Sequence, residues 1–400
     1  MRADRSAQLL LFAVLAGVFW SIGAIDLNRP QQDRVTLLLI GGGLAWAVLR
    51  GLPVGPLVGG YAVLIAAAER LGREPLVGAS DVIPATAEAI GTLLRGENPY
   101  THVMQVTIPV GSPLVYPPGE FLFYTPTFLL GGDISRVETW TGILTVAVLA
   151  LAGFRVGHGV AALPAMLYAT WGIAAFRTVD GGNDVSAAFL VVVALVALAF
   201  ARSSDRATRA GAFALSALAL GWALAFKQFA VLVFPLVLRH LAVSGAPWKR
   251  YGAAAAAVAA AFIVPFLLWA PGPFLAQQVQ ALTFHDTVWG ANLPHLLSQA
   301  IDVAPLLPAF FLLEIGLTAA ALTMAILAPD PSLGRAAIYA AGVVSLPLLL
   351  ARWTTQSYYV YAATIAAAGI ALLEVRVGER RAAHGAIDRV RAGDTGQQNN

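Results

Sequence analysis

The sequence contains no cysteine, and only 12% of its 400 residues are charged. The absence of cysteine excludes disulfide bonds, thiolate catalysis and cysteine-ligated metal sites. A soluble domain carries roughly a quarter charged residues, so this chain has about half of the usual charge. The formal net charge of +3 is small and spread along the chain, which argues against nucleic acid as a partner.

Motifs for nucleotide binding and hydrolysis are missing as well. The sequence has no P-loop, no glycine-rich dinucleotide fingerprint and no G-x-S-x-G elbow. The loops expected on the cytoplasmic side are also too short for a nucleotide-sugar domain. Any activated donor is therefore expected to come from the membrane or from its outer side.

Hydrophobic residues, in contrast, make up 58% of the chain, and its mean hydropathy is +0.73. Apolar runs recur along the whole sequence, and each is long enough for a helix across a hydrocarbon core about 30 Å thick. Helices are expected because every backbone polar group inside lipid must be paired. The sequence thus predicts an all-α polytopic membrane protein with about 12 transmembrane helices. The expected spans are 7–25, 35–49, 52–68, 139–154, 160–177, 185–201, 209–226, 229–243, 251–270, 306–328, 335–351 and 357–374.

The positive charges predict the orientation of these spans. Lysine and arginine gather in the loops 202–209 and 239–250 and in the tail, all of which are cytoplasmic if there are twelve spans. The apolar segment 117–131 would invert every later loop if it crossed the membrane, so we interpret it as a short re-entrant or interfacial helix. Both termini are then cytoplasmic, and long extracytoplasmic loops are expected at about 69–138 and 271–305.

The domain organisation that follows is simple. One transmembrane domain is expected over residues 1–378, and a disordered cytoplasmic tail over 379–400, where the sequence becomes polar. No internal repeat is found, which weakens an interpretation as an inverted-repeat transporter.

The first outer loop contains the strongest candidate for chemistry. Asp81 opens a predicted helix over Val82–Arg95, and Glu88 follows seven residues later on the same face. On one interpretation, Ser80 or Asp81 only caps the first amides of this helix. On the other, Asp81 is a reactive carboxylate at the outer surface of the membrane.

The residues around Asp81 form a pattern known from one group of enzymes. Ser80-Asp81-Val82 and the predicted helix are followed by Gly96-Glu97-Asn98-Pro99-Tyr100 and by Tyr116-Pro117-Pro118. This pattern resembles polyprenyl-phosphate-sugar-dependent glycosyltransferases of the GT-C superfamily, and among them glycosyltransferase family 87, which is mannosyltransferase-like. The resemblance implies GT-C-like extracytoplasmic loops, in which Asp81 acts as the catalytic base.

Two further segments are similar to this family. The turn Asp180-Gly181-Gly182-Asn183-Asp184 follows a predicted span, and Phe226-Lys227-Gln228 precedes an apolar run. The resemblance implies that Lys227 and His285 bind the donor phosphate. Arg352, which begins a predicted outer turn, is a further candidate because the departing phosphate needs cations. The resemblance also implies a substrate pocket formed by Glu88, Asn98, Tyr100, Tyr116, Asn183, Asp184 and Gln228.

Each of these side chains also has a simpler interpretation. Lys227 could be a surface lysine that snorkels, and Arg352 could anchor the interface beside Trp353. His285 could pack within its loop, and Trp289 could belong to the aromatic belt rather than stack on a sugar. A metal site is not expected, because His285 and His295 lack helical metal-ligand spacing; a divalent cation is not indicated, and no cofactor is expected.

The sequence therefore leads to one main hypothesis and two alternatives. The main hypothesis is an inverting glycosyltransferase of the cell membrane, with its active site on the extracytoplasmic face. It would move a sugar, mannose being favoured, from a polyprenyl-phosphate donor to a lipid or glycan acceptor. The alternatives are a lipid or solute transporter or flippase and a non-catalytic scaffold subunit. A transporter places ionisable groups near the bilayer midplane, and the predicted spans have almost none except Glu314.

Overall fold

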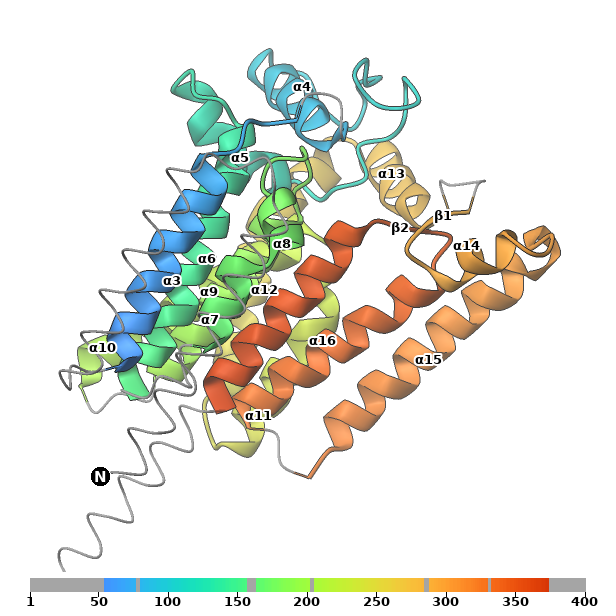
Figure 1. Ribbon diagram of the computed structural model, residues 1–400. Helices are drawn as coiled ribbons and strands as arrows, with labels where there is room; N and C mark the ends of the chain where they lie inside the picture. Colours follow the sequence, from blue (N-terminus) through green and yellow to red (C-terminus); the bar gives the residue numbers. More distant parts are fainter. Residues whose placement is uncertain are drawn as a thin grey trace, which may run out of the picture.

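The computed structural model describes residues 54–76, 80–156, 163–201, 205–283, 288–329 and 332–373. The expected spans 7–25 and 35–49 and the expected tail 379–400 lie outside these residues. The rest of the chain forms a bundle of helices to which one pair of two-residue strands is added. Figure 1 shows the long helices side by side, with shorter helices at one end of the bundle.

The expected spans from 52–68 onward are found as helices, with one exception. Their boundaries differ from the prediction by only a few residues, because the ends are set by turns and by polar side chains that hydropathy does not resolve. These helices are α3 (Val54–Leu71), α6 (Ser135–Val156), α9 (Asp184–Phe200), α10 (Arg206–Phe226), α11 (Ala230–Val243), α12 (Trp248–Trp269), α15 (Leu307–Leu327), α16 (Leu333–Leu350) and a last helix, Gln356–Leu373.

The exception is the segment 160–177, for which one continuous helix was the wrong prediction. It contains two helices, α7 (Leu163–Thr170) and α8 (Gly172–Phe176), and the backbone between them is extended at Trp171. The buried Arg70 side chain donates hydrogen bonds to the carbonyl oxygens of Tyr168 (3.1 Å) and Ala169 (3.2 Å). In an unbroken helix these carbonyls would accept from amides four residues later, so Arg70 stabilises the break.

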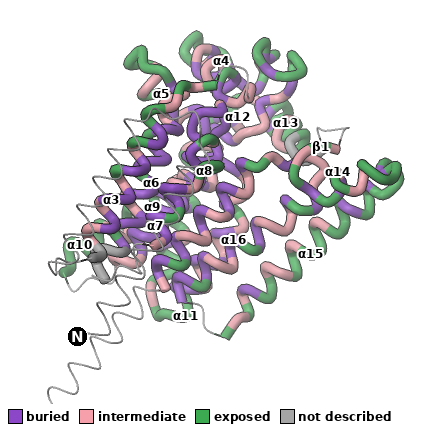
Figure 2. Tube along the Cα trace, in the orientation of Figure 1, coloured by how far each residue is buried: buried purple, intermediate pink, exposed green. Residues whose placement is uncertain are grey.

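By length and composition, six of the described helices can cross a membrane, as in a multi-pass membrane protein. The expected total of about 12 spans is not confirmed, and the orientation stays a prediction. Figure 2 shows buried residues in the middle of the bundle and exposed ones along α15. Exposed side chains there include Leu312 and Leu327, at 70% and 73% exposure, which suits a helix surrounded by lipid. The six segments are Ser135–Ala152, Arg206–Phe226, Trp248–Trp269, Ala304–Leu327, Leu333–Leu350 and Gln356–Leu373.

The segment 117–131 forms the short helix that the charge pattern required. Helix α5 (Gly119–Leu129) has 11 residues, and at about 1.5 Å per residue it is too short to cross a membrane. It packs closely on α10, where the Trp222 indole donates a 2.8 Å hydrogen bond to the Gly119 carbonyl. A Cβ atom at Gly119 would lie 2.6 Å from the carbonyl oxygen of Ala225, so only glycine fits this contact.

The other short helices lie around α5 and next to the strand pair. Helix α4 (Val82–Leu94) confirms the helix predicted after Asp81, and α13 (Pro271–Thr283) and α14 (Leu293–Ser298) belong to the second expected outer loop. In Figure 1, α4, α5 and α13 lie at the same end of the bundle.

The strand pair connects two segments far apart in the sequence. Strand β1 (Trp289–Gly290) pairs in parallel with β2 (Trp353–Thr354), with Trp289 opposite Trp353. The Trp289 amide donates to the Arg352 carbonyl at 2.9 Å. Gly290 has a φ of +109°, and a Cβ there would lie 2.0 Å from the Thr354 carbonyl oxygen. Glycine thus allows β1 to approach β2 this closely.

Candidate functional site

Asp81 lines a cavity of about 690 Å³ at the end of the bundle where α4 lies. Its wall combines carboxylates, an arginine and hydroxyl groups with four large aromatic side chains. The polar side chains are Ser80, Asp81, Thr107, Ser112, Arg177, Asp180, Asp184, Thr354, Thr355, Gln356 and Ser357, and the aromatic ones are Tyr116, Trp289, Trp353 and Tyr358.

The Asp81 side chain does not cap α4, which removes the simpler interpretation of this residue. The Val82 amide instead donates to Ser80 Oγ at 3.3 Å, and the Ile83 amide donates to the carbonyl of Gly181 at 3.1 Å. These two acceptors satisfy amides of the first turn, among them the Ile83 amide that an N-cap carboxylate at Asp81 would bind. Asp81 Oδ2 accepts from the Ile108 amide at 2.7 Å. The carboxylate is therefore held at the cavity wall by the loop opposite.

The turn between α8 and α9 provides both the Gly181 carbonyl and part of the cavity wall. Gly181 has a φ of +82°, and Asp180 Oδ1 accepts from the Gly182 amide at 3.0 Å. Arg177 pairs with Asp180 at 2.5 Å and donates to Gln356 Oε1 at 3.0 Å. Burial raises the pKa of Asp180, although the bonds from Arg177 and Gly182 oppose this effect. Arg177 is thus a cation in the same cavity as Asp81.

A second cavity of about 190 Å³ adjoins the first one, and four residues line both cavities. Most of its wall is apolar, from α15, α16 and Phe229, and its ionisable side chains are Lys227, Glu314 and Arg352. The residues that line both cavities are Val115, Tyr116, Trp353 and Tyr358. The two cavities therefore share one wall, with a polar chamber on one side and, on the other, a largely apolar chamber that contains Lys227, Arg352 and the acid Glu314.

Lys227 lies at the junction of α10 and α11, as the sequence predicted, but it is only 3% exposed. It forms an ion pair with Asp184 and donates to Asn183 Oδ1 at 2.9 Å. Its ammonium group lies 4.7 Å from the ring centre of Tyr358 and 5.3 Å from that of Tyr116, within the range of cation–π attraction. Because it is buried, Lys227 is not a snorkelling surface residue. The charge of its ammonium group is balanced by Asp184.

Arg352 and Gln228 complete the second cavity. The backbone carbonyl of Arg352 accepts from Trp289 of β1, so the strand pair holds Arg352 in place. Gln228 Nε2 donates to the Val115 carbonyl at 2.8 Å. The structure thus brings Tyr116, Lys227, Gln228 and Arg352 to one cavity, and Asp81, Tyr116 and Asp184 to the other.

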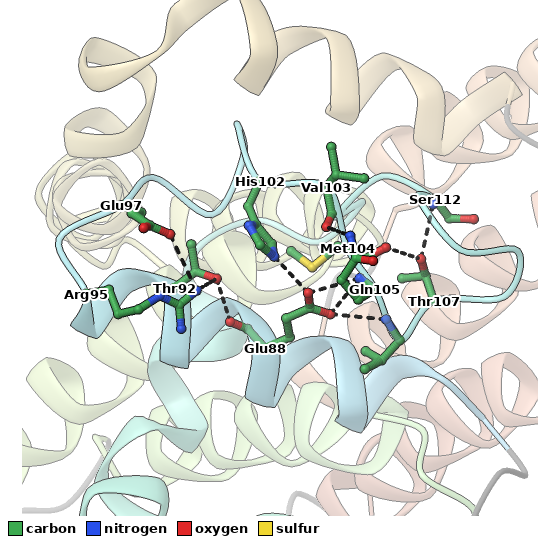
Figure 3. Close-up of polar contacts among 11 residues, drawn as sticks. Glu88, Thr92, Arg95, Glu97, His102, Val103, Met104, Gln105, Thr107 and Ser112 are labelled. Carbon is green, nitrogen blue, oxygen red and sulfur yellow. Dashed lines mark hydrogen bonds and ion pairs between the residues drawn. The ribbon is translucent and has the colours of Figure 1, made fainter.

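Glu88 contacts the loop after α4 and lies outside the lining of both cavities (Figure 3). Its carboxylate accepts from the amides of Gln105 (2.9 Å) and Val106 (3.2 Å) and bonds to His102 Nε2 at 2.7 Å. Burial raises the pKa of Glu88, but these hydrogen bonds together lower it below its ordinary value. Glu88 therefore fixes the loop whose Ile108 amide binds Asp81.

Asn98 and Tyr100 also lie outside the two cavity linings. Asn98 Oδ1 accepts from the Tyr100 amide at 2.9 Å, which makes the turn after α4. The Tyr100 ring is buried at 4.8 Å from that of Phe274, and its hydroxyl donates to the Tyr116 carbonyl at 2.7 Å. These residues support the loop that carries Tyr116.

The remaining predicted residues are Asn183 and His285. Asn183 is fully buried and connects Lys227 with Glu120, to which its Nδ2 donates at 3.2 Å. His285 lies outside the described residues. Trp289, four residues later in the sequence, contacts Trp353, with ring centres 4.7 Å apart and ring planes tilted by 33°.

Sequence reasoning missed several side chains of this region. Glu120 and Arg177 had one visible signal each: Glu120 is an acid within an otherwise apolar segment, and Arg177 lies three residues before Asp180. Glu138 lies one residue before a predicted span and proves to be buried in α6, where it accepts from Tyr124 and Ser186. Its packing depends on residues distant in sequence, which periodicity does not reveal.

The described part of the chain has no group of three or more His, Cys, Asp or Glu side chains arranged to hold a metal ion.

Comparison with known proteins gives one distant structural similarity. No protein-family model and no curated protein matches the sequence. Among solved structures, the crystal structure of ArnT from Cupriavidus metallidurans bound to undecaprenyl phosphate is 15% identical in sequence, with a TM-score of 0.48. The match covers 80% of this chain but only 59% of ArnT.

Proposed function

We propose that the chain is an inverting glycosyltransferase that uses a polyprenyl-phosphate-linked sugar at the extracytoplasmic face of the membrane. One observation carries the proposal: Asp81 lines a polar cavity that shares a wall with an apolar cavity containing Lys227 and Arg352. A lipid-linked sugar matches this arrangement, because an anionic phosphate joins its apolar chain to its polar sugar.

The apolar cavity suits the donor lipid. Leu307, Phe310 and Phe311 offer surface for the polyprenyl chain. Arg352 and Lys227, which line this same cavity, are cations that can stabilise the phosphate as it departs. Because Lys227 is already paired with Asp184, it would bind the phosphate as a member of that pair.

The polar cavity suits the sugar and the acceptor. The hydroxyl-rich wall and the rings of Trp289 and Trp353 provide hydrogen bonds and flat apolar faces for a carbohydrate. Asp81 would remove the proton of the acceptor hydroxyl as its oxygen attacks the anomeric carbon. The bond from that carbon to the phosphate oxygen breaks, and the phosphate leaves with the electron pair. This substitution inverts the anomeric configuration.

Mannose is the proposed sugar, and a lipid or a glycan is the proposed acceptor. Both rest on the resemblance of the Asp81 loop to glycosyltransferase family 87. No observation on the described residues favours the alternative of a transporter.

The proposal is tested by following sugar transfer from polyprenyl-phosphate-mannose with the purified protein in lipid nanodiscs. Asp81→Asn keeps the size of the side chain and removes its basicity, and we expect turnover to fall by about 10²–10⁴-fold with unchanged donor binding. Glu97→Gln is the matched control, since Glu97 is an exposed carboxylate outside both cavities. Undiminished turnover in Asp81→Asn would remove Asp81 from the mechanism, and no transfer from any polyprenyl-phosphate sugar by the unmodified protein would contradict the proposed function.

A further inference from the structure

Glu120 is a completely buried carboxylate that the proposed reaction does not use. It lies in the first turn of α5, and its Oε1 accepts from Thr86 Oγ1 at 2.7 Å and from Asn183 Nδ2 at 3.2 Å. Its Oε2 is buried and has no hydrogen-bond partner among the described residues. Buried polar atoms are nearly always paired, so this oxygen calls for a physical reason.

The position of Glu120 connects the two halves of the site. Thr86 belongs to α4, the helix that begins directly after Asp81. Asn183 accepts a hydrogen bond from Lys227 through Oδ1 while it donates to Glu120 through Nδ2. One chain of hydrogen bonds thus runs from α4 through Glu120 and Asn183 to Lys227.

The charges in this cluster do not balance when every acid is ionised. Lys227 provides one positive charge, and its pairing with Asp184 already neutralises it. An ionised Glu120, which Asn183 connects to Lys227 by hydrogen bonds, adds a negative charge that forms no ion pair with a cation of the described residues. Such a charge is unfavourable in a buried site.

Glu120 changes its charge near neutral pH. Burial raises its pKa to about 7, although the hydrogen bonds from Thr86 and Asn183 and the charge of Lys227 lower it in part. A neutral Glu120 carries its proton on one oxygen. On Oε2 this proton would have no acceptor, whereas on Oε1 it can be donated to Thr86 Oγ1, whose own proton then goes to the Val82 carbonyl at 2.8 Å. The other ionisable groups that face Glu120 or its partners are the carboxyl groups of Asp184 and Glu138 and the phenols of Tyr100, Tyr116, Tyr124 and Tyr358.

We infer that Glu120 is a positioning residue for the donor phosphate: when neutral it holds Asn183 and Lys227 in place for the anion, and when ionised it weakens the binding of that anion. The inference rests on the proposed function, because it takes the anion to be the phosphodiester of a lipid-linked sugar. Lys227 must attract the phosphate while it is paired with Asp184. A second carboxylate charge nearby repels the phosphate and offsets part of that attraction.

The test measures the binding of a short polyprenyl methyl phosphodiester to the full chain in nanodiscs between pH 5.5 and 8.5. This probe keeps a single negative charge over the whole range. Glu120→Gln retains an oxygen that can accept from Thr86 and Asn183 but cannot ionise. For the unmodified protein we expect the affinity to fall by about fivefold as the pH rises through 7, which corresponds to about 1 kcal/mol. For Glu120→Gln we expect a flat profile, and for the control Glu97→Gln the profile of the unmodified protein.

A second variant keeps the test decisive if Glu120→Gln does not fold. Thr86→Val is nearly the same size and removes one hydrogen bond to the carboxylate of Glu120. Because that bond favours the charged form, its loss moves the fall in affinity to higher pH.

The role of Glu120 would be overturned if the affinity fell with pH equally in the unmodified protein and in Glu120→Gln, or if Thr86→Val left the pH of the fall unchanged. Either result would leave the proposed function intact. Absence of probe binding by the unmodified protein at every pH would overturn both.

Discussion

Lys227 and Asp184 form an ion pair in which the two side chains are only 3% and 4% exposed. Asp184 begins α9, and Lys227 ends α10, so the pair connects the ends of two helices at the wall between the cavities. The negative charge of Asp184 is favourable at a helix N-terminus. The same pair thus has a structural role and places a cation beside the apolar cavity.

The first prediction concerns this pair. Asp184→Asn leaves a buried ammonium without its counter-charge, and we expect the free energy of unfolding to fall by about 3–5 kcal/mol. Thermal unfolding in detergent micelles measures the loss as a lower midpoint. In the double variant with Lys227→Met, the loss should be smaller than in Asp184→Asn alone, because no unpaired charge remains. Equal losses in the single and double variants would show that the pair is not coupled.

The second prediction concerns the loop that holds Asp81. Glu88→Gln replaces an acceptor of several hydrogen bonds by an amide, and we expect the Gln105 and Val106 amides to exchange hydrogen about tenfold or more faster. Hydrogen-exchange mass spectrometry of peptides over 102–110 gives this rate, with Glu97→Gln as the control.

The same contact predicts a pH dependence. The hydrogen bonds hold the pKa of folded Glu88 below its ordinary value, so the unfolded chain binds the proton more readily. Their stabilisation is complete above the ordinary pKa of Glu, about 4.3, and is lost as the pH falls through the lower folded value. The protection of the loop amides, taken relative to the intrinsic exchange rate at each pH, should thus decrease in acid for the unmodified protein and change less in Glu88→Gln. The reverse trend would contradict the role of Glu88.

The third prediction uses the absence of cysteine. Trp289 and Trp353 lie opposite each other in the parallel strand pair, so Trp289→Cys together with Trp353→Cys should form a disulfide under mild oxidation. Intact-mass measurement after alkylation detects it without background from other thiols. Each single variant should remain fully alkylated. Full alkylation of the double variant would mean that the two segments do not meet.

The fourth prediction compares Arg352, the proposed phosphate contact, with an arginine that lines neither cavity. Arg352→Met keeps a long side chain and removes its charge, and we expect KM for the lipid donor to rise by about tenfold or more through loss of a charged contact to phosphate. Arg95→Met is the control, because Arg95 is exposed and pairs with Glu97. Equal KM values in the two variants would exclude Arg352 as a phosphate contact.

Hydropathy and charge were sufficient to predict most of the helices. The spans from 52–68 to 357–374 depend on long apolar runs, which are local in sequence. The short helix at α5 was predicted from the expected cytoplasmic position of the arginine-rich loops. The break at Trp171 was not predictable in this way, because it depends on Arg70, about a hundred residues earlier in the chain.

The site was predictable only in part for the same reason. Three charged side chains stand out next to apolar runs, and each lines a cavity: Asp81 the first, and Lys227 and Arg352 the second. The roles of Glu88, Asn98 and Tyr100 in loop packing follow from tertiary contacts. Glu120 was missed because its importance depends on Thr86 and Asn183, which α4 and the turn before α9 bring to it.

The central claim is that one lipid-linked donor occupies both cavities, with its phosphate beside the cations and its sugar beside Asp81. A density map of the protein in nanodiscs with a bound polyprenyl-phosphate sugar tests this directly. The account predicts the phosphate within hydrogen-bonding distance of Arg352 or Lys227, and the sugar in the chamber lined by Asp81. A donor bound elsewhere on the bundle, or one whose sugar points away from Asp81, would contradict it.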